Sequence, residues 1–396
     1  MQGRALVAAM SAAQVGALLP HVTLPAVMPT HLIPLWGLSN SDAGLMAAAY
    51  AIGYMLAVPA LTLLTDRIDA RRILAAGAAA TALATLAFPL FAVGLWSAAL
   101  LWGLAGAGYA GAYMPGLRAL TDRLGSADAS RSVTLYTASF SLGVGVSYLV
   151  AQLVAERWGW RAAFVVTGLG PLAMLAVALA LRPVPPPPGH RRLLDLRPAL
   201  ANRAAFGYSL AYGAHCFELY GLRTWIVAFW GFVVAQPGAG MPLGPVAVST
   251  AFTLLALPCS VLGNEAALRW GRHRAISWVM LGSAVLAAAI GLTAGLSPWV
   301  TLVLLTAYAF TVPADSGALT SGASGAAAAQ SRGATLALHS AIGFGLSALG
   351  GWAVGIALDA GGGAQSAQGW AMAFLVLAAG VALGPLALAW SRRAQP

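Results

Sequence analysis

The stretch His215-Cys216-Phe217-Glu218-Leu219-Tyr220-Gly221-Leu222-Arg223 places a carboxylate and a guanidinium inside an apolar segment that runs from about Ala204 to Val234. A segment this long and this apolar can cross a lipid bilayer as a helix. Ionisable groups at membrane depth cost several kcal/mol unless they face protein or water. The stretch therefore predicts a membrane-spanning helix whose ionisable side chains serve a function.

The composition of the whole chain agrees with this local prediction. Of its 396 residues 60% are hydrophobic and 8% are charged, whereas soluble domains carry roughly 25% charged residues. A chain so poor in charge cannot cover a globular surface with polar groups, so we expect an integral membrane protein. No Walker loop, metal-ligand cluster or nucleophile constellation stands out in the sequence. We therefore expect neither an enzyme nor a bound cofactor or metal.

Apolar runs of about 20 residues predict twelve membrane-spanning helices. Because the runs are continuous and do not alternate between apolar and polar residues, helices are favoured over strands. The predicted spans are approximately 5–33, 43–64, 73–94, 97–120, 132–155 and 160–181, then 204–233, 246–268, 275–295, 298–320, 333–357 and 369–390.

The positions of the arginines predict the orientation of these spans. The net charge of +10 comes from arginine alone, and the arginines recur in short gaps between apolar runs. If twelve spans alternate, one side of the membrane holds nearly all of them and the other only Arg157 and Arg161. Cytoplasmic loops are enriched in arginine and lysine, so both termini should be cytoplasmic and the protein a multi-pass component of the inner membrane. Arginines spread in this way do not form a nucleic-acid patch.

A proline-rich segment divides the chain into two predicted halves. Residues 1–181 and 204–396 would each form six helices, joined by a cytoplasmic linker at 182–203. The linker begins with the run Pro183–Pro188, which cannot continue a helix; a docking site for a partner is the functional alternative. The halves also repeat, because Arg131–Leu135 resembles Arg332–Leu336 about 200 residues later. Paired repeats of this kind build transporters whose binding site lies at the membrane midplane.

The loop after the second predicted span carries a family resemblance. It reads Thr62-Leu63-Leu64-Thr65-Asp66-Arg67-Ile68-Asp69-Ala70-Arg71-Arg72 and is similar to the motif G-x-L-A-D-R-x-G-R-K/R of the major facilitator superfamily. Thr62 and Asp69 stand where the family prefers glycine. A second copy, Asn264–Arg272, keeps Gly271 and both arginines but has Leu268 at the aspartate position. The resemblance covers essentially the whole chain and implies an all-α fold of two six-helix halves.

In this family such loops hold the cytoplasmic side closed during part of the transport cycle. What the resemblance implies is therefore a cytoplasmic gate. The alternative is that the arginines only set the topology. The residues assigned to the gate are Asp66, Arg67, Arg71, Arg131, Arg269 and Arg272.

Polar side chains within the predicted spans are candidates for solute binding. Gln14 and His21 lie close to two helical turns apart, so they share one face of the first span. Arg223 could hold a solute carboxylate in bidentate fashion. The alternative is a structural role between helices. The predicted binding residues are Gln14, His21, Tyr113, Tyr212, His215 and Arg223.

Glu218 is the predicted proton-coupling residue, with His215 as its modulator, because burial perturbs the protonation of a carboxyl group. Glu218 and Arg223 are five positions apart, about 140° around a helix, so they need not pair. A structural ion pair with another helix is the alternative role.

Together these features predict a secondary transporter that moves a small polar or anionic organic solute by alternating access, coupled to protons. We expect it to work as a monomer. One alternative is an efflux antiporter for drugs or metabolites. The Gly-Pro pattern typical of drug antiporters is missing from Gly143–Ser147, which counts against it. The other alternative is a membrane sensor that does not transport.

Overall fold

The computed structural model describes residues 3–124, 126–186, 196–238, 240–328 and 331–392, and in these ranges the regular structure is helical, without strands. The helices up to residue 186 are α1 (Gly3–Ala17), α2 (Thr23–Val27), the π-helix η1 (Met28–Leu32), α3 (Ile33–Trp36), α4 (Asn40–Leu64), α5 (Ala70–Phe91), α6 (Leu95–Thr121), α7 (Ser126–Trp158), α8 (Trp160–Leu169) and α9 (Pro171–Ala180). Those that follow are α10 (Arg197–Ala201), α11 (Arg203–Val234), α12 (Pro245–Trp270), α13 (Arg272–Thr293), α14 (Pro298–Thr311), α15 (Ser316–Ala326), α16 (Arg332–Ala360), α17 (Ala367–Ala382) and α18 (Gly384–Arg392).

The twelve predicted spans all coincide with helices or with short series of helices. In the described residues, ten helices or joined helix pairs are long and apolar enough to cross a membrane. The other two predicted spans are α6, with 27 residues, and the broken series from α1 to α3. Helices satisfy every backbone hydrogen bond within one segment, which hydrocarbon requires. The prediction of a twelve-helix membrane fold is confirmed.

Some predicted spans are interrupted, and two interruptions place polar side chains at their break. His21 lies in the turn between α1 and α2, and Asp315 lies between α14 and α15. Pro20 and Pro313 stand in these same breaks, where a missing N–H ends the helical ladder. Discontinuous helices at membrane depth commonly line solute sites. The breaks therefore mark places where a side chain can be presented to a cavity.

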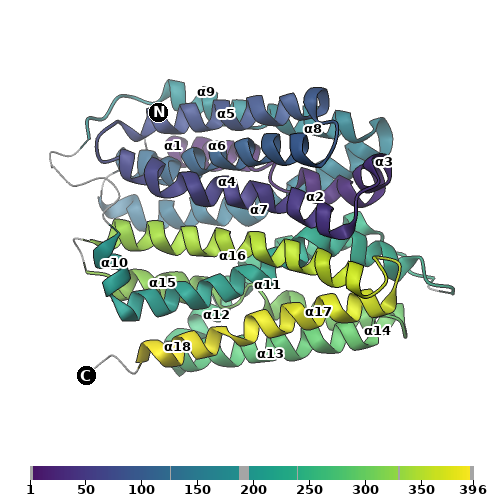
Figure 1. The fold of residues 1–396 in the computed structure, drawn as a ribbon. Helices are drawn as coiled ribbons and strands as arrows, with labels where there is room; N and C mark the ends of the chain where they lie inside the picture. The colour runs from purple at the N-terminus through teal and green to yellow at the C-terminus, as the bar shows by residue number, and fades with distance from the viewer. Residues whose placement is uncertain (1–2, 125, 187–195, 239, 329–330, 393–396) are drawn as a thin grey trace. The chain divides into compact units, whose positions relative to one another are not determined.

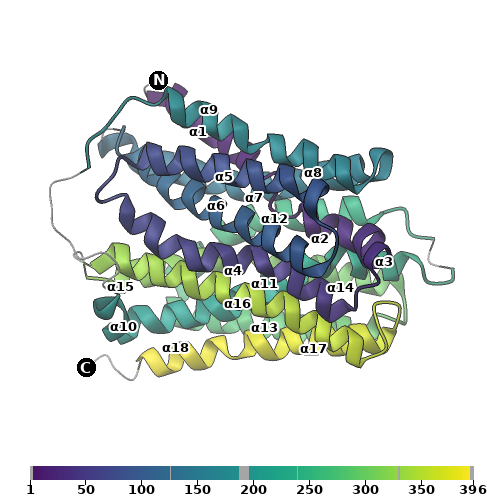
Figure 2. The same ribbon diagram turned by 45° about the horizontal axis from the view of Figure 1, so that its top comes forward.

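The chain forms two compact units, and the first consists of Met1–Val27 with Ala49–Asp195. In this unit α5 packs along α6 and against α9, and α1 packs against α7 (Figures 1 and 2). A side chain at Gly77 of α5 would collide with the backbone of Gly111 in α6. Such close approach between small residues is how helices associate in lipid.

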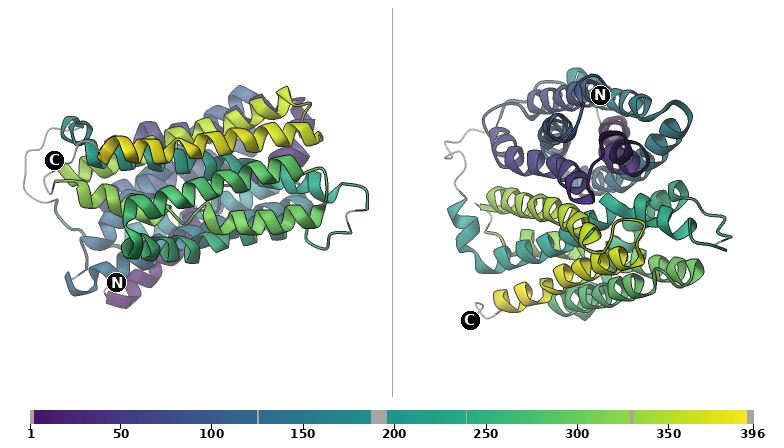
Figure 3. Two further views of the ribbon diagram at one scale, coloured as in Figure 1. Left: turned by 90° about the horizontal axis from the view of Figure 1, so that it is seen from below. Right: turned by 45° about the vertical axis from the view of Figure 1, so that its right-hand side comes forward.

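The second unit consists of Met28–Ala48 with Leu196–Pro396. Its helix α11 contacts α16, α15, α17 and α18, so the polar stretch around Glu218 lies inside a bundle. Helices α17 and α18 follow each other end to end (Figure 3). Residues 28–48, which the sequence assigned to the first half, group with this unit. Within the predicted linker, residues 182–186 are not helical, α10 follows, and residues 187–195 lie outside the described part.

Candidate functional site

A buried histidine and aspartate meet inside the second unit. His215 on α11 places Nδ1 2.6 Å from Oδ1 of Asp315, and their side chains are 1% and 2% exposed. The break after α14 lets Asp315 face α11 instead of continuing a helical face. A neutral histidine and an aspartic acid, or their charged forms, differ only in which group holds one proton. The contact therefore links α11 to the break between α14 and α15.

Glu218 lies one turn further along α11, among hydroxyl groups. Its Oε1 accepts hydrogen bonds from Ser283 Oγ of α13 at 2.7 Å and from Tyr308 OH of α14 at 2.9 Å. Thr311 donates to Ser283 at 3.3 Å and extends the chain of hydroxyls. In the described residues Glu218 forms no ion pair, with Arg223 or any other cation. The partners of its carboxyl group are thus hydroxyls of neighbouring helices.

Aromatic rings connect the remaining predicted residues of α11 to α16. The ring of Tyr212 stacks on His215 at 5.6 Å and on His339 at 4.0 Å between centroids. His339 also has Ser209 Oγ and Thr320 Oγ1 within 3.3 Å of its two ring nitrogens. Both polar atoms of that ring thus have protein partners, which supports a structural role for it.

Arg223 is buried in the same unit. It is 3% exposed, and its guanidinium lies 5.4 Å from the centre of the Tyr220 ring. An arginine over an aromatic face keeps its planar fork oriented. A solute anion that reached this position would meet a fixed donor.

The first unit brings its predicted residues together around tyrosines. Gln14 donates to Tyr109 OH at 2.8 Å and accepts from Tyr136 OH at 2.9 Å, so both ends of its amide have protein partners. The ring of Tyr113 stacks on both tyrosines, with centroids 6.1 and 6.2 Å away. His21 lies 5.8 Å from the Tyr109 ring. Gln14, His21 and Tyr113 therefore belong to one aromatic cluster.

In the loop between α4 and α5, the most connected carboxylate is Asp69. It accepts hydrogen bonds from the backbone N–H of Arg71 and of Val184, and ion-pairs with Arg71 and Arg123 at 3.0 Å. The Arg123 side chain is 1% exposed and also donates to the carbonyl of Arg182. Burial raises the pKa of Asp69, but the hydrogen bonds from Val184, Arg71 and Arg123 outweigh it, so the pKa lies below the ordinary 3.8. Asp69 thus ties the ends of three helices together.

Asp66, the predicted gate carboxylate, has a looser environment. It lies 3.5 Å from Arg118, and both side chains are about a third exposed. Exposed pairs of this kind contribute at most about 1 kcal/mol. Arg67 is exposed, and the side chain of Arg131 lies outside the described part of the chain. The gate role of these residues stays a prediction.

The second copy of the motif lacks an acidic centre. Leu268 occupies the aspartate position, and across the described residues neither Arg269 nor Arg272 forms an ion pair. Asn264 accepts a hydrogen bond from Ser321 Oγ at 3.2 Å instead. The two loops therefore differ in their electrostatics, although the sequences repeat.

Sequence reasoning missed several of these contacts. Ser283 and Tyr308 were not singled out, because a serine or tyrosine in an apolar run gives no signal until its neighbour across the bundle is known. Asp69 was noted only as a departure from glycine. Its partner Arg123 is the last residue of Leu120-Thr121-Asp122-Arg123, an echo of the loop motif, which was the available clue.

Comparison with known families agrees with the fold and the loop motif. A sequence profile of the Major Facilitator Superfamily matches residues 5–351. The chain belongs to the major facilitator superfamily. The resemblance drawn from residues 62–72 is thereby confirmed, and the protein is a multi-pass membrane protein of a transporter family.

Solved structures of this superfamily share the fold. A bacterial homologue of the human lysosomal transporter Spinster, in an inward-facing and occupied conformation, has a TM-score of 0.78 at 18% identity, covering 98% of this chain and 96% of that one. An autoinhibited peptide transporter of the POT family has a TM-score of 0.74 at 14% identity, covering 99% and 97%. At these identities the likeness concerns the fold alone.

Two curated relatives match parts of the chain. Protein spinster homolog 1 of Homo sapiens is 29% identical over 224 residues, 52% of this chain and 42% of the relative. The membrane sensor protein UhpC of Salmonella typhimurium is 32% identical over 133 residues, 33% of this chain and 30% of the relative. The chain thus spans less than half the length of the curated relatives it matches.

Proposed function

We propose that this superfamily member is a secondary active transporter that moves a small polar or anionic organic solute by alternating access, with protons coupled through Glu218. The environment of the Glu218 side chain supports this function most strongly. Its carboxyl group is 1% exposed inside a helical bundle and has the hydroxyls of Ser283 and Tyr308 as hydrogen-bond partners.

Hydroxyl partners suit a carboxyl group that changes its protonation state. An arginine can only donate, so it matches the carboxylate alone, whereas a hydroxyl can donate to a carboxylate or accept from a carboxylic acid. In a water-poor interior the two forms differ strongly in free energy, so protonation responds to the access of water. A transporter that opens alternately to each side changes that access in every cycle. Glu218 would then load and release a proton with the conformational change.

His215 and Asp315 support the same mechanism as a second proton-holding pair. His215 lies on α11 with Glu218, and Asp315 lies in the break that follows α14, the helix that carries the Glu218 partner Tyr308. A movement of α14 would alter both sites together. We assign His215 the modulating role predicted from the sequence and add Asp315 as its partner.

Residues in each unit are proposed to contact the solute. In the second unit we assign Tyr212, His215 and Arg223, with Arg223 as the group that favours an anionic solute. In the first unit we assign Gln14, His21 and Tyr113. Because both ends of Gln14 already have partners, solute binding there would require a tyrosine hydroxyl to exchange its hydrogen bond.

The loop after α4 would control the side predicted to be cytoplasmic. Asp66, Arg67, Arg71, Arg131, Arg269 and Arg272 remain the proposed gate residues. Asp69 and Arg123 are proposed as the support that keeps Arg71 in place, because Arg71 binds Asp69 and also donates to the carbonyl of Leu181 at 2.9 Å.

Export of a drug or metabolite differs from this proposal in direction. A non-transporting sensor differs in class. It is supported by the match of one third of the chain to UhpC, a relative that is named as a membrane sensor protein. Vesicle measurements separate these possibilities. Purified protein in liposomes that contain a trapped pH-sensitive dye is presented with a panel of organic anions, nucleosides, dipeptides, sugars and amines.

A transporter coupled to protons would change the internal pH with at least one compound, and protein-free liposomes would not. The contrary outcome is a compound that stabilises the purified protein against heat while neither protons nor the radiolabelled compound itself cross the liposome membrane. That result would support a sensor function and contradict transport.

A further inference from the structure

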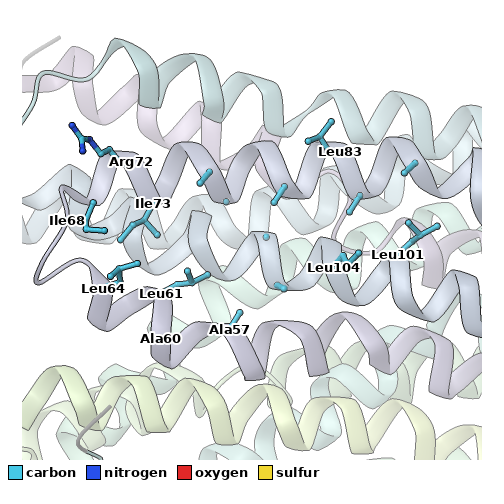
Figure 4. A pocket seen from close by; sticks show the side chains of 17 residues that line it. Ala57, Ala60, Leu61, Leu64, Ile68, Arg72, Ile73, Leu83, Leu101 and Leu104 are labelled. Atoms are coloured by element: carbon cyan, nitrogen blue, oxygen red, sulfur yellow. The ribbon is translucent and has the colours of Figure 1, made fainter. Parts of the chain in front are cut away.

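An apolar groove of about 960 Å³ lies among α4, α5 and α6 in the first unit. Figure 4 shows leucine, isoleucine and small side chains along its length and the guanidinium of Arg72 at one end. Arg72 is the one charged residue in its lining. Representative wall residues are Ala57 and Leu61 of α4, Ala80 and Leu83 of α5, and Leu104 of α6.

The groove opens toward the outside of the helical bundle. The side chains of Leu83 and Leu104 are 69% and 51% exposed. Because α4 and α5 are apolar helices long enough to span a membrane, an opening on their outer surface meets lipid tails and not water. The natural occupant of the groove is therefore a hydrocarbon chain.

Small residues explain why α4 and α6 touch at one point and leave a space beyond it. A side chain at Gly53 of α4 would collide with the backbone of Gly103 in α6, and one at Gly106 would collide with Tyr50. The two helices therefore touch through their backbones at this crossing. Beyond the crossing, toward Arg72, the wall positions are mostly alanine and leucine, and the alanines leave the space between helices unfilled.

The dimensions of the groove match one leaflet of a bilayer. Its lining runs along α5 from Arg72 to Ala87, which is about 22 Å at 1.5 Å per residue. Half of a bilayer with its headgroup region measures about the same, roughly 20 Å. A chain that fills the groove would place its headgroup beside Arg72.

Arg72 itself is available for a headgroup. It is exposed, and within the described residues its guanidinium has no hydrogen bond or ion pair, whereas the neighbouring Arg71 is bound to Asp69. We propose that this groove binds a phospholipid with an anionic headgroup, one acyl chain lying along α5 and the phosphate contacting Arg72. Guanidinium and phosphate form charge-assisted, often bidentate hydrogen bonds, and basic sites near helix ends select anionic lipids.

Native mass spectrometry of the delipidated full-length protein tests this proposal, with phosphatidylglycerol and phosphatidylcholine of identical chains as probes. We expect the wild type to bind one phosphatidylglycerol in preference to phosphatidylcholine. Arg72→Gln should weaken phosphatidylglycerol binding about fivefold, the equivalent of the ~1 kcal/mol that one basic residue contributes near the membrane surface. Arg72→Lys should keep most of the preference. Arg4→Gln, at another exposed arginine outside the groove, should leave it unchanged.

A second variant tests the groove itself. Ala80 is exposed within the groove, so Ala80→Phe fills the space without entering the core and should weaken binding of both lipids. Equal binding of the two lipids to the wild type, or an unchanged preference in Arg72→Gln, would overturn the proposal. So would retained lipid binding in Ala80→Phe, or a dimer that this variant abolishes, since a second copy would then be the occupant.

Discussion

The imidazole of His215 and the carboxyl group of Asp315 lie 2.6 Å apart with almost no exposed surface. This contact joins α11 to the break between α14 and α15. Because Asp315 lies in a break between helices, it can shift without opening a continuous ladder of backbone hydrogen bonds. The two side chains should therefore be coupled in stability and able to separate during a conformational change.

Removal of both members of this pair should cost less than the sum of the two single removals. Asp315→Ala leaves a buried histidine without its carboxyl partner, so we expect the free energy of unfolding to fall by about 3 kcal/mol. The double variant with His215→Leu should lose less than the sum of the single changes. Denaturant unfolding in detergent micelles, arranged as a double-mutant cycle, measures the coupling. Strictly additive losses would show that the contact does not hold the bundle together.

Asp69 should make the stability of the protein depend on pH. Its folded pKa lies below the ordinary 3.8, so its contribution is present above the unfolded pKa and is lost as the pH falls through the folded value. At pH 7, Asp69→Asn should lower the unfolding free energy by about 2 kcal/mol, the range of a hydrogen bond to a charged group.

The difference between wild type and Asp69→Asn should shrink below about pH 5 and vanish under acid conditions in which both proteins remain folded. Asp66→Asn is the matched control, because the pair of Asp66 with Arg118 is exposed. An equal effect of the two variants at pH 7 would contradict the central place given to Asp69 in this loop.

Asp359, at the end of α16, caps the beginning of α4. Its two carboxylate oxygens accept hydrogen bonds from the backbone N–H groups of Asn40 and Ser41, at 3.0 and 2.7 Å, and from both of their side chains. A lost N-cap costs about 1 kcal/mol, so Asp359→Ala should lower the unfolding free energy by at least that amount. Asp42→Ala should cost less, because the Asp42 carboxylate accepts hydrogen bonds from nearby Ser39 and not, among the described residues, from another helix. The opposite order would contradict the role of Asp359.

Where α16 touches another helix, replacing a glycine by a larger residue should destabilise the protein. A methyl group at Gly350 would collide with the backbone oxygen of Phe217, whereas Gly282 has open space around it. We expect Gly350→Ala to destabilise the protein by about 1–3 kcal/mol, as overpacking does. Gly282→Ala should be neutral or slightly stabilising, because alanine favours helix. Thermal unfolding of both variants in micelles checks this contrast.

The sequence predicts the helices well because length and apolarity alone determine a membrane span. The breaks were harder, since Pro115 and Pro258 lie inside unbroken helices while Pro313 stands in a break. Whether a proline interrupts a helix depends on neighbouring helices that can satisfy the freed carbonyl. The sequence does not show these neighbours.

The candidate site was predictable only in part. Glu218 and His215 stand out because charge inside an apolar run is costly. Asp315 is a weaker candidate from the sequence, because a carboxylate near Pro313 could line a cavity or only cap a helix end. Ser283 gives no signal, because it is one small polar residue among many. A motif comparison also directed attention to Asp66, whereas burial and hydrogen bonding select Asp69, which stands where the family has glycine.

The proposed coupling of protons to solute movement through Glu218 is tested most directly by comparing Glu218→Gln with wild type in proteoliposomes. The solute is one found in the dye screen. Two assays are run: accumulation driven by an imposed pH gradient, and exchange of labelled for unlabelled solute without a gradient. Tyr308→Phe serves as a control that keeps the carboxyl group. We predict that Glu218→Gln loses gradient-driven accumulation and keeps exchange. Normal gradient-driven accumulation by Glu218→Gln would show that Glu218 does not couple protons to transport.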